Sequence, residues 1–441
     1  MAAEATVAER AWAAVPGAAC GQITDCFERP GPRALAGEMC EAMLMEVDTR
    51  NCWTLAEARG HRGPHRLQHF LSRAMVDHDT ARDRIAAWTA GELAAPEAVL
   101  IVDETGDEKS LTDCVGAAHQ YSGALGGIGL CQVAVHLTYA SRHGHAPIDR
   151  TLYLGREWTA DEERRLLTHV PDGLTFATKP QLVADMLTRA RGLGVPARWL
   201  AGDEVYGSRE LRLTARALGF DHALAVRCDH RVDTAIGRTS VTDLATRVPR
   251  KNWMLLRTGH GLKGDRPYDW AMLDIRPDDT PDDQEPGHSF VLVRRHRYTR
   301  ELSFHRCHPA RPVTLADLVD VVYCRWGGRR LPARQGHLRP RPGPDHLLEL
   351  LDALDPDQHA RHRRPRDHPR PHRSGRSRNH THQTHAGQRP RTPAPATDHR
   401  AAPAPPRSRP HAALLHLAPP PSVPGSRGPP PLDNITAATT T

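Results

Sequence analysis

The sequence has no long apolar run, no CxxC pair and few aromatic residues. No apolar run approaches the ~20 residues of a membrane span, and no N-terminal segment joins a basic region, an apolar core and a small-residue cleavage site. The nine cysteines have no repeated spacing, which argues against a disulfide framework or a zinc ribbon. We therefore expect a cytoplasmic protein with reduced thiols and no membrane partner. One cluster has metal-ligand residue types but lacks a second ligand pair: His305, Cys307 and His308.

Charge is distributed unevenly along the chain. Only 39% of the 441 residues are hydrophobic, which is low for a fully globular protein of this length. Residues 1–326 carry 40 Lys+Arg and 44 Asp+Glu, whereas residues 327–441 carry 19 and 8. After Trp326 there is no Phe, Trp, Tyr, Cys, Lys or Met. The sequence therefore predicts a slightly acidic body and a disordered, basic, Pro/Arg/His-rich tail over residues 327–441.

Residues 1–95 are predicted to form a helical N-terminal domain. LAEARG, LQHFLSRAM and DRIAAWTAGELAA place apolar residues at helical spacing, with breaks at Gly60 and at Gly63-Pro64. One of the turns between them holds a basic cluster: His61, Arg62, His65 and Arg66. Such side chains bind DNA phosphates, but a solvated turn explains them equally well.

From Val99 to about Val226 the pattern changes to strands and helices in α/β order. Val99–Val102, Gln132–Ala140 and Arg150–Gly155 predict three successive antiparallel strands that turn at GALGGIGL and HGHAPID. A helix (KPQLVADMLTRARGLG), a strand (ARWLAGD), a second helix (RELRLTARALGF) and a strand (HALAVRC) follow. This order predicts an α/β fold with a ribonuclease-H-like mixed sheet, in a domain spanning residues 96–326.

Segments of β pattern continue over residues 227–315: KNWMLLRTG, PYDWAMLDIRP, SFVLVRRHRY and ELSFHRC. We expect them to form a β-rich insertion in the sheet domain. Between two of them lies the acidic stretch Asp274–Gly287, for which we expect a solvated loop.

Two aspartates follow buried-strand patterns, Asp103 after VLIV and Asp203 after WLAG. Each is expected where its strand opens into a loop, so that in one sheet the two carboxylates converge at one edge. Paired carboxylates of this kind bind divalent cations. Alone, either aspartate has the simpler reading of a helix cap or turn residue. Glu104 and Glu204 rank below the aspartates, because successive strand residues point to opposite faces.

Blocks between about residues 50 and 326 resemble, in order, the DDE-type transposases of bacterial insertion sequences, in particular the insertion-sequence 701-like group. The blocks are NCWTLAEARGHRGPHRLQHFLSRA, VLIVDETGDEKSLTDCVGAAHQYSGALG, CQVAVHLTYA, DRTLYLGREWT, FATKPQLVADML, WLAGDEVYGS and KGDRPYDWAMLDI. Several of these blocks resemble the family only weakly when taken alone, whereas the full set in this order is specific to the family. The resemblance implies a ribonuclease-H-like catalytic domain with a β-rich insertion after the second aspartate.

The resemblance also implies a site and partners. Asp103 and Asp203 would be catalytic acids and metal ligands for two Mg²⁺ or Mn²⁺ ions, which stabilise the entering and leaving oxygens of phosphoryl transfer. The partner would be double-stranded DNA, both terminal inverted repeats and target DNA, bound by a homo-oligomer in the nucleoid. Side chains expected to contact the DNA are Arg62, Arg66, Lys109, Gln132, Lys179 and Tyr206.

The third acid of the family, a glutamate a few residues beyond an Arg-Trp pair, is missing. Arg325-Trp326 is followed by GGRRLPARQGH. Leu348, Leu351 and Leu354 each precede an acidic residue, and CTG-GAN in a frame displaced by one base contains TGG, tryptophan. The same displacement lets residues 327–337 encode AVEDFQPAKG, which resembles the glutamate helix of the family.

We therefore predict that a frameshift near codon 327 replaced the final helices and impaired catalysis. A genuine nucleic-acid-binding arm is the alternative reading of the tail. Two other functions stay open: a ribonuclease-H-like nuclease, which would lack the N-terminal helices and the insertion, and a domesticated, non-catalytic DNA-binding protein.

Overall fold

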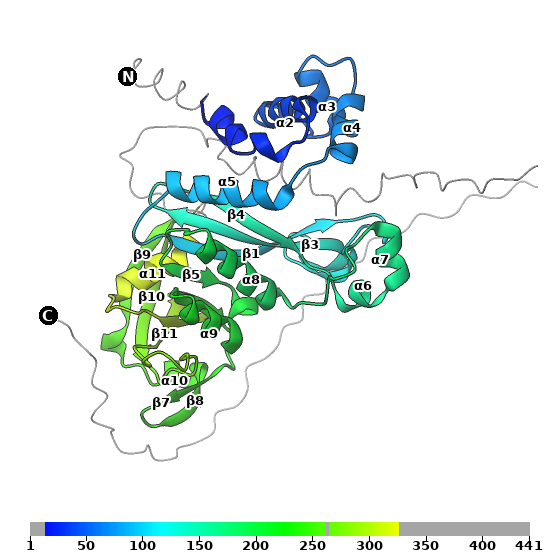
Figure 1. The fold of residues 1–441 in the computed structure, drawn as a ribbon. Coiled ribbons are helices and arrows are strands. Elements are labelled where there is room, and N and C mark those ends of the chain that lie inside the picture. Colours follow the sequence, from blue (N-terminus) through cyan, green and yellow to red (C-terminus); the bar gives the residue numbers. More distant parts are fainter. Residues whose placement is uncertain (1–13, 262–263, 326–441) are drawn as a thin grey trace, which may run out of the picture. The chain divides into compact units, whose positions relative to one another are not determined.

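A computed structural model describes residues 14–261 and 264–325 of the chain (Figure 1). The predicted tail and the proposed frameshift lie outside these residues, as does Trp326. Among the helices described, none is both long and apolar enough to cross a bilayer.

The N-terminal part is helical, as predicted. Residues 14–22 are helical and are followed by η1 (Thr24–Cys26), α2 (Pro30–Met43), α3 (Cys52–Ala58), α4 (His65–Arg73) and α5 (His78–Glu92). Asn51 begins α3 by accepting hydrogen bonds from the backbone N–H groups of Trp53 and Thr54. The helices enclose a small apolar core in which the rings of Phe27 and Phe70 stack at 6.4 Å.

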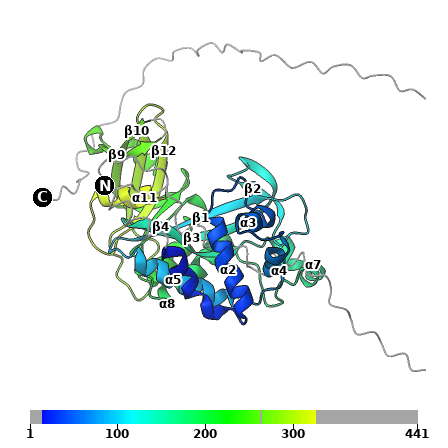
Figure 2. The ribbon, with the colours of Figure 1, turned by 90° about the horizontal axis from the view of Figure 1, so that it is seen from above.

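Helix α5 belongs to two apolar cores at once. Ala81 and Ile85 face the core of the N-terminal helices, whereas Ala86 and Ala90 pack into the core beneath the sheet. Because the apolar residues lie on two sides of the helix, α5 connects the N-terminal helices to the sheet (Figures 1 and 2).

The centre of the fold is a mixed sheet in which every predicted strand is present. Its first half consists of β1 (Val99–Glu108), β2 (Ala118–Ser122), β3 (Gly127–Ser141), β4 (Gly144–Leu152), β5 (Trp199–Gly202) and β6 (Asp221–Val226). Strand β3 pairs antiparallel with β1, β2 and β4, while β5 lies parallel between β1 and β6. This mixed α/β arrangement is consistent with a ribonuclease-H-like fold.

Two strand boundaries differ from the prediction. Strand β1 does not end at Asp103 but continues to Glu108, because β3 is long enough to pair with it as far as Cys131. Strand β4 begins at Gly144, inside the segment predicted to be a turn. Its Pro147 is tolerated because β4 lies at the edge of the sheet and pairs with β3 alone within the described residues.

Helices cover both faces of the sheet. The intervening helices are α6 (Arg156–Ala160), α7 (Glu162–Thr168), α8 (Lys179–Gly192), η2 (Glu204–Tyr206) and α9 (Arg209–Ala217). Apolar residues of α8 and α9 share a core with Leu100, Val102 and Leu200. The alternate residues Val99, Ile101 and others pack on the opposite face against α11 (Leu315–Cys324). The period-2 alternation of strand side chains thus separates an α8 face from an α11 face.

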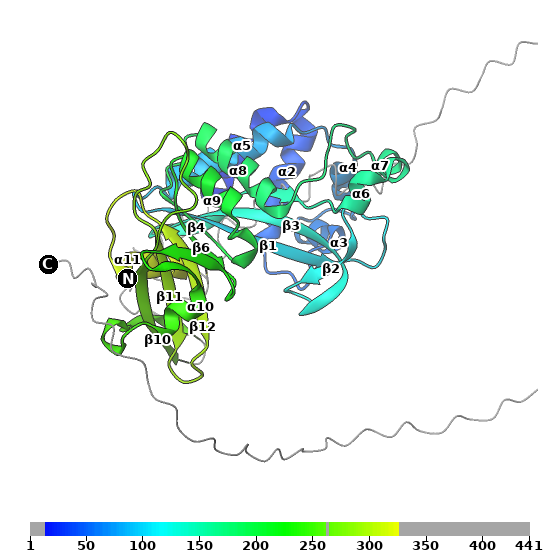
Figure 3. The same cartoon turned by 90° about the horizontal axis from the view of Figure 1, so that it is seen from below.

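In the segment predicted to be a β-rich insertion, four of the described strands extend the same sheet. The segment contains β7 (Arg231–Thr234), β8 (Gly237–Ser240), α10 (Val241–Thr246), η3 (Arg250–Asn252), β9 (Met254–Gly261), β10 (Gly264–Asp274), β11 (Phe290–His296) and β12 (Leu302–His308). Strand β12 pairs antiparallel with β6, and β11, β10 and β9 follow in turn. Figure 3 shows β10, β11 and β12 grouped together near β6. The β7–β8 hairpin forms a separate two-stranded sheet.

Candidate active site at two neighbouring aspartates

Asp103 and Asp203 follow directly after paired residues of two parallel strands. Strands β1 and β5 run side by side in the same direction, and the last residues that pair are Val102 and Gly202. Ile101 and Ala201 both face α11, and residues two apart in a strand share a face. Asp103 lies within β1 and Asp203 directly follows β5, so the two aspartates are neighbours on the same side of the sheet, where β5 ends.

Gly202 makes this approach possible. A Cβ at residue 202 would lie 2.6 Å from the Val102 Cγ1 atom and 3.1 Å from the Leu224 Cδ2 atom. Strand β5 therefore fits between β1 and β6 only without a side chain there. Beyond it the chain turns into η2, where the Asp203 Oδ1 atom accepts a hydrogen bond of 3.0 Å from the Val205 N–H, which fixes the carboxylate.

The Asp203 carboxyl ionises less readily than an ordinary aspartate. Burial raises the pKa of the Asp203 carboxyl above its ordinary value, the nearby Arg325 guanidinium opposes the rise, and the charges of Asp103 and Glu104 add to it. Arg325 directly follows α11, so that the end of this helix lies near enough for its charge to act on the Asp203 carboxylate.

Next to Asp103, across the β1–β3 pair, lies a histidine that is neutral at pH 7. Asp103 pairs with His136, and His136 in turn pairs with Arg150 of β4. Burial and the Arg150 charge lower the pKa of His136 to about 4. Its Nε2 atom lies 2.8 Å from the Thr105 hydroxyl oxygen. The ring therefore adds no positive charge beside the exposed Asp103 carboxylate.

Glu104 lies on the opposite face of β1 from Asp103, as the alternation of strand side chains predicts. Its carboxylate forms an ion pair with Lys179, the first residue of α8. The Lys179 ammonium also lies 5.4 Å from the centre of the Tyr153 ring. Tyr206 is completely buried on this side, and burial raises the pKa of its hydroxyl, with the charges of Glu104 and Asp203 adding to the rise.

The donor set fits part of a divalent-cation site. Asp103 and Asp203 carry hard oxygen donors. Burial, with a smaller contribution from the Asp103 and Glu104 charges, raises the pKa of Asp203, and a bound cation would offset this cost of ionisation. Within residues 14–261 and 264–325, however, no three His, Cys, Asp or Glu side chains come together in a way that could hold a metal ion. If Asp103 and Asp203 bind a cation, a third protein ligand would have to come from elsewhere.

The other residues predicted to contact DNA do not gather at this edge. Lys109 pairs with Asp107 near the far end of β1, roughly 20 Å along the strand from Asp103. Arg62 and Arg66 are exposed at the turn before α4 and at its start. Gln132 is buried, with its Nε2 atom donating to the Val115 carbonyl oxygen at 2.8 Å, which leaves it unavailable to DNA.

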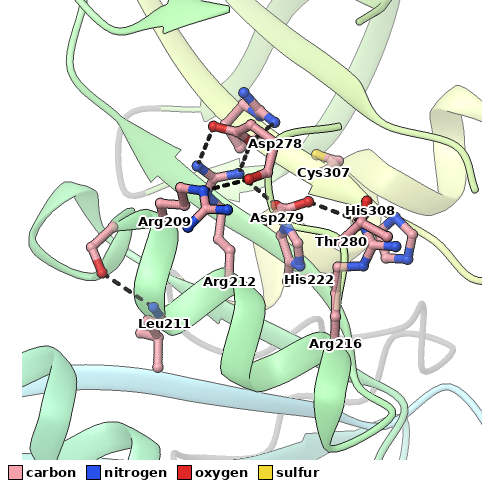
Figure 4. Close-up of polar contacts among 12 residues, drawn as sticks. Arg209, Leu211, Arg212, Arg216, His222, Asp278, Asp279, Thr280, Cys307 and His308 are labelled. Carbon is pink, nitrogen blue, oxygen red and sulfur yellow. Dashed lines mark hydrogen bonds and ion pairs between the residues drawn. The ribbon is translucent and has the colours of Figure 1, made fainter. Parts of the chain in front are cut away.

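The prediction that Asp274–Gly287 is a solvated loop is wrong for the central residues of this segment. Asp279 is completely buried and accepts a hydrogen bond from Arg216 of α9 at 3.0 Å, and Asp278 accepts from Arg212 at 2.7 Å and from Arg306 of β12 at 2.6 Å (Figure 4). Burial acts to raise the pKa of Asp278, but the two guanidinium groups outweigh it and hold that pKa well below its ordinary value. The loop ties the insertion to the helix that follows Asp203.

The cluster His305, Cys307 and His308 does not converge on one point. All three are buried on β12, where His305 and Cys307 share a face and His308 points to the other. His308 lies against His222, with ring centres 5.8 Å apart. Neither the pair nor the single residue joins a set of metal ligands among the described residues.

Comparison with known families agrees with this arrangement. A sequence model described as DDE superfamily endonuclease matches residues 22–251, just over half of the chain. The match covers η1 to α5, both aspartates and the segment after β6 as far as residue 251. No curated protein matches the sequence. From the extent of the family match, the chain belongs to the DDE superfamily endonucleases.

Proposed function

We propose that this chain is an insertion-sequence DNA transposase whose ancestor cleaved and joined element ends, and that this copy is catalytically impaired. The proposal depends on one observation, the pairing of Val102 with Gly202. This pairing makes Asp103 and Asp203 neighbours at the point where β5 ends. Family membership supports an enzyme of the endonuclease and transposase type that acts on DNA.

In this proposal Asp103 and Asp203 hold Mg²⁺ or Mn²⁺. The bound ions would stabilise negative charge on the entering and leaving oxygens of phosphoryl transfer. The Val205 N–H orients the Asp203 carboxylate. The neutral His136 leaves the Asp103 charge available to a cation. Lys179, held beside the site by Glu104, is proposed to contact a DNA phosphate.

The surrounding elements support a transposase over a nuclease of the same fold. A simple ribonuclease-H-like nuclease was expected to lack both the N-terminal helices and the β-rich insertion, and this chain has both. We assign the helices, with Arg62 and Arg66, to the terminal repeats of the element. Lys109 is assigned to DNA outside the acid pair, and assembly as a homo-oligomer on DNA completes the proposal.

The impairment follows from the residue types after Arg325. The charge of Arg325 acts on the Asp203 carboxylate, and the sequence that follows, up to residue 337, contains no Asp or Glu. A site that requires three carboxylates and holds two loses an anchor for one ion. We therefore expect the chain to bind divalent cations weakly.

The test is DNA nicking by two purified proteins, the chain itself and a frame-restored variant. In the variant, residues from 327 onward are replaced by the translation of the displaced frame. With Mg²⁺ and a supercoiled plasmid that carries the element ends, we expect nicking by the frame-restored protein alone, and its loss in D103N and D203N. Equal and robust nicking by the unmodified chain would contradict the impairment. An inactive but folded frame-restored protein would contradict the assigned function.

A second candidate is a non-catalytic DNA-binding protein, which the missing third acid favours. Mobility-shift assays on element ends, with and without residues 327–441, separate the two. If removal of residues 327–441 abolished DNA binding, the tail would be a functional DNA-binding arm. That result would contradict the frameshift hypothesis.

A further inference from the structure

The hairpin that joins β11 to β12 is unusually basic and carries an exposed aromatic ring. Its sequence, residues 294–301, is RRHRYTRE. At the turn, the Arg297 and Arg300 side chains are 48% and 67% exposed, and Tyr298 is 83% exposed. A tyrosine this open gains nothing from the core of the protein, so its apolar ring is available to a partner.

A single carboxylate organises the arginines. Asp269 of β10 lies 3.0 Å from the Arg295 guanidinium, 3.6 Å from that of Arg297 and 4.0 Å from that of Arg300. One negative charge therefore faces three positive charges. The two outer guanidinium groups keep much of their exposure and their capacity to bind an anion, while Asp269 restricts their positions.

Aromatic contacts fix the base of the hairpin. The Arg295 guanidinium lies 3.8 Å from the centre of the Trp253 ring, and Arg294 lies 4.8 Å from that of Tyr268. Tyr268 also packs edge-on against His296 at 5.6 Å. Arg250 and Lys251, exposed in η3 just before Trp253, extend the basic surface.

The turn itself has a defined conformation. The His296 N–H donates to the Glu301 carbonyl oxygen at 2.9 Å, and the Arg300 N–H donates to the His296 carbonyl oxygen at 3.0 Å. The Thr299 N–H donates to the His296 Nδ1 atom at 3.0 Å. Arg300 has a φ of +62°, a left-handed conformation that non-glycine residues seldom adopt. The turn thus presents Arg297, Tyr298 and Arg300 in a fixed arrangement.

We infer that this hairpin binds DNA with unpaired bases, with Arg297 and Arg300 on backbone phosphates and Tyr298 stacked on a base. Arginine beside an exposed aromatic ring is the combination that single-stranded nucleic acid requires, since every base has a face for stacking and every phosphate an anionic oxygen. The hairpin lies outside residues 22–251, which match the family. The inference rests on the proposed function for the choice of DNA, but it involves neither Asp103 nor Asp203.

The experiment uses the full chain without divalent metal and two labelled DNA probes, a blunt duplex and the same duplex with a single-stranded tail. Binding is followed by fluorescence anisotropy at several salt concentrations. In R297Q/R300Q we expect weaker binding to both probes and a salt dependence, log K against log [salt], reduced by nearly two. In Y298A we expect about 5- to 150-fold weaker binding to the tailed probe and unchanged binding to the blunt duplex, with Y298F close to the unmodified chain.

A matched control is R142Q, which removes an exposed arginine from the β3–β4 hairpin turn and should leave both affinities unchanged. Circular dichroism establishes that each variant is folded. Unchanged affinity and salt dependence in R297Q/R300Q would overturn the inference. So would an equal loss on both probes in Y298A, or displacement of DNA by poly-glutamate at matched charge, which would assign the hairpin to an acidic protein partner. Because no metal is present, failure of the nicking assay has no bearing on these outcomes.

Discussion

Gly202 lies opposite Val102 in the parallel pairing of β1 with β5, so close that a methyl group on residue 202 would come within 2.6 Å of the Val102 Cγ1 atom. We expect G202A to lower the free energy of unfolding by about 1–3 kcal/mol, the usual cost of an extra methyl group in a packed core. Denaturant unfolding measures the change. The control is G91A on α5, where a Cβ meets nothing within 4 Å. A G202A variant as stable as G91A would show that the contact is not tight.

The two acidic residues at the sheet edge should differ in their effect on metal binding. Asp103 lies on the face shared with Asp203, whereas Glu104 pairs with Lys179 on the other face. We expect D103N to weaken Mn²⁺ binding at least tenfold, about 1.4 kcal/mol, and E104Q to change it less than twofold. Titration of each variant with Mn²⁺, followed by electron paramagnetic resonance, measures both. A larger loss in E104Q would make Glu104 the ligand.

The buried ion pairs between the acidic loop and α9 should contribute strongly to stability. In D279N the Arg212 and Arg216 guanidinium groups lose a buried carboxylate partner, and we expect a loss of about 3–5 kcal/mol. The control is D229N, because Asp229 pairs with Arg227 at 3.1 Å on the surface, where solvent screens the charges and the pair contributes little to stability. Chemical unfolding compares the two. Equal losses would show that burial of the network adds nothing.

Stability should fall in mild acid because of His305. Burial, with Arg294 and Arg325, lowers the pKa of this side chain to about 3 in the folded protein, whereas its ordinary value is about 6.5. The folded state therefore favours the neutral ring, and its contribution is present above pH 6.5 and is lost as the pH falls toward 3. At pH 5 the loss is roughly 2 kcal/mol. Unfolding at pH 7.5 and 5.0 should show a smaller pH effect in H305Q, and an identical one would refute the assignment.

The sheet could be predicted from sequence because its strands are short apolar runs separated by turn residues. Strand β2 (AHQYS) was missed, since its residues carry no such run and it forms only as part of a hairpin with β3. The extent of β1 beyond Asp103 was missed for a similar reason. The extent of β1 depends on the length of β3, and this length cannot be predicted from the residues of β1.

The interactions of charged residues could not be predicted in the same way. The loop DDTPDDQE resembles a solvated segment, and its partners Arg212, Arg216 and Arg306 lie far away in the sequence. The meeting of Asp103 and Asp203 was predictable only because strands of one sheet can share an edge. The presence of Arg325 beside Asp203 required the packing of α11 on the sheet, which no local pattern records.

The helix α11 packs its apolar side chains under the sheet and ends at Arg325, next to Asp203. The strands described in residues 14–261 and 264–325 are thus encoded before the proposed change of reading frame. A shift of reading frame just after Arg325 would erase the chemistry while sparing the hydrophobic interior. The protein would then remain folded but inactive. It would still occupy the DNA ends of intact copies of the element and reduce their transposition.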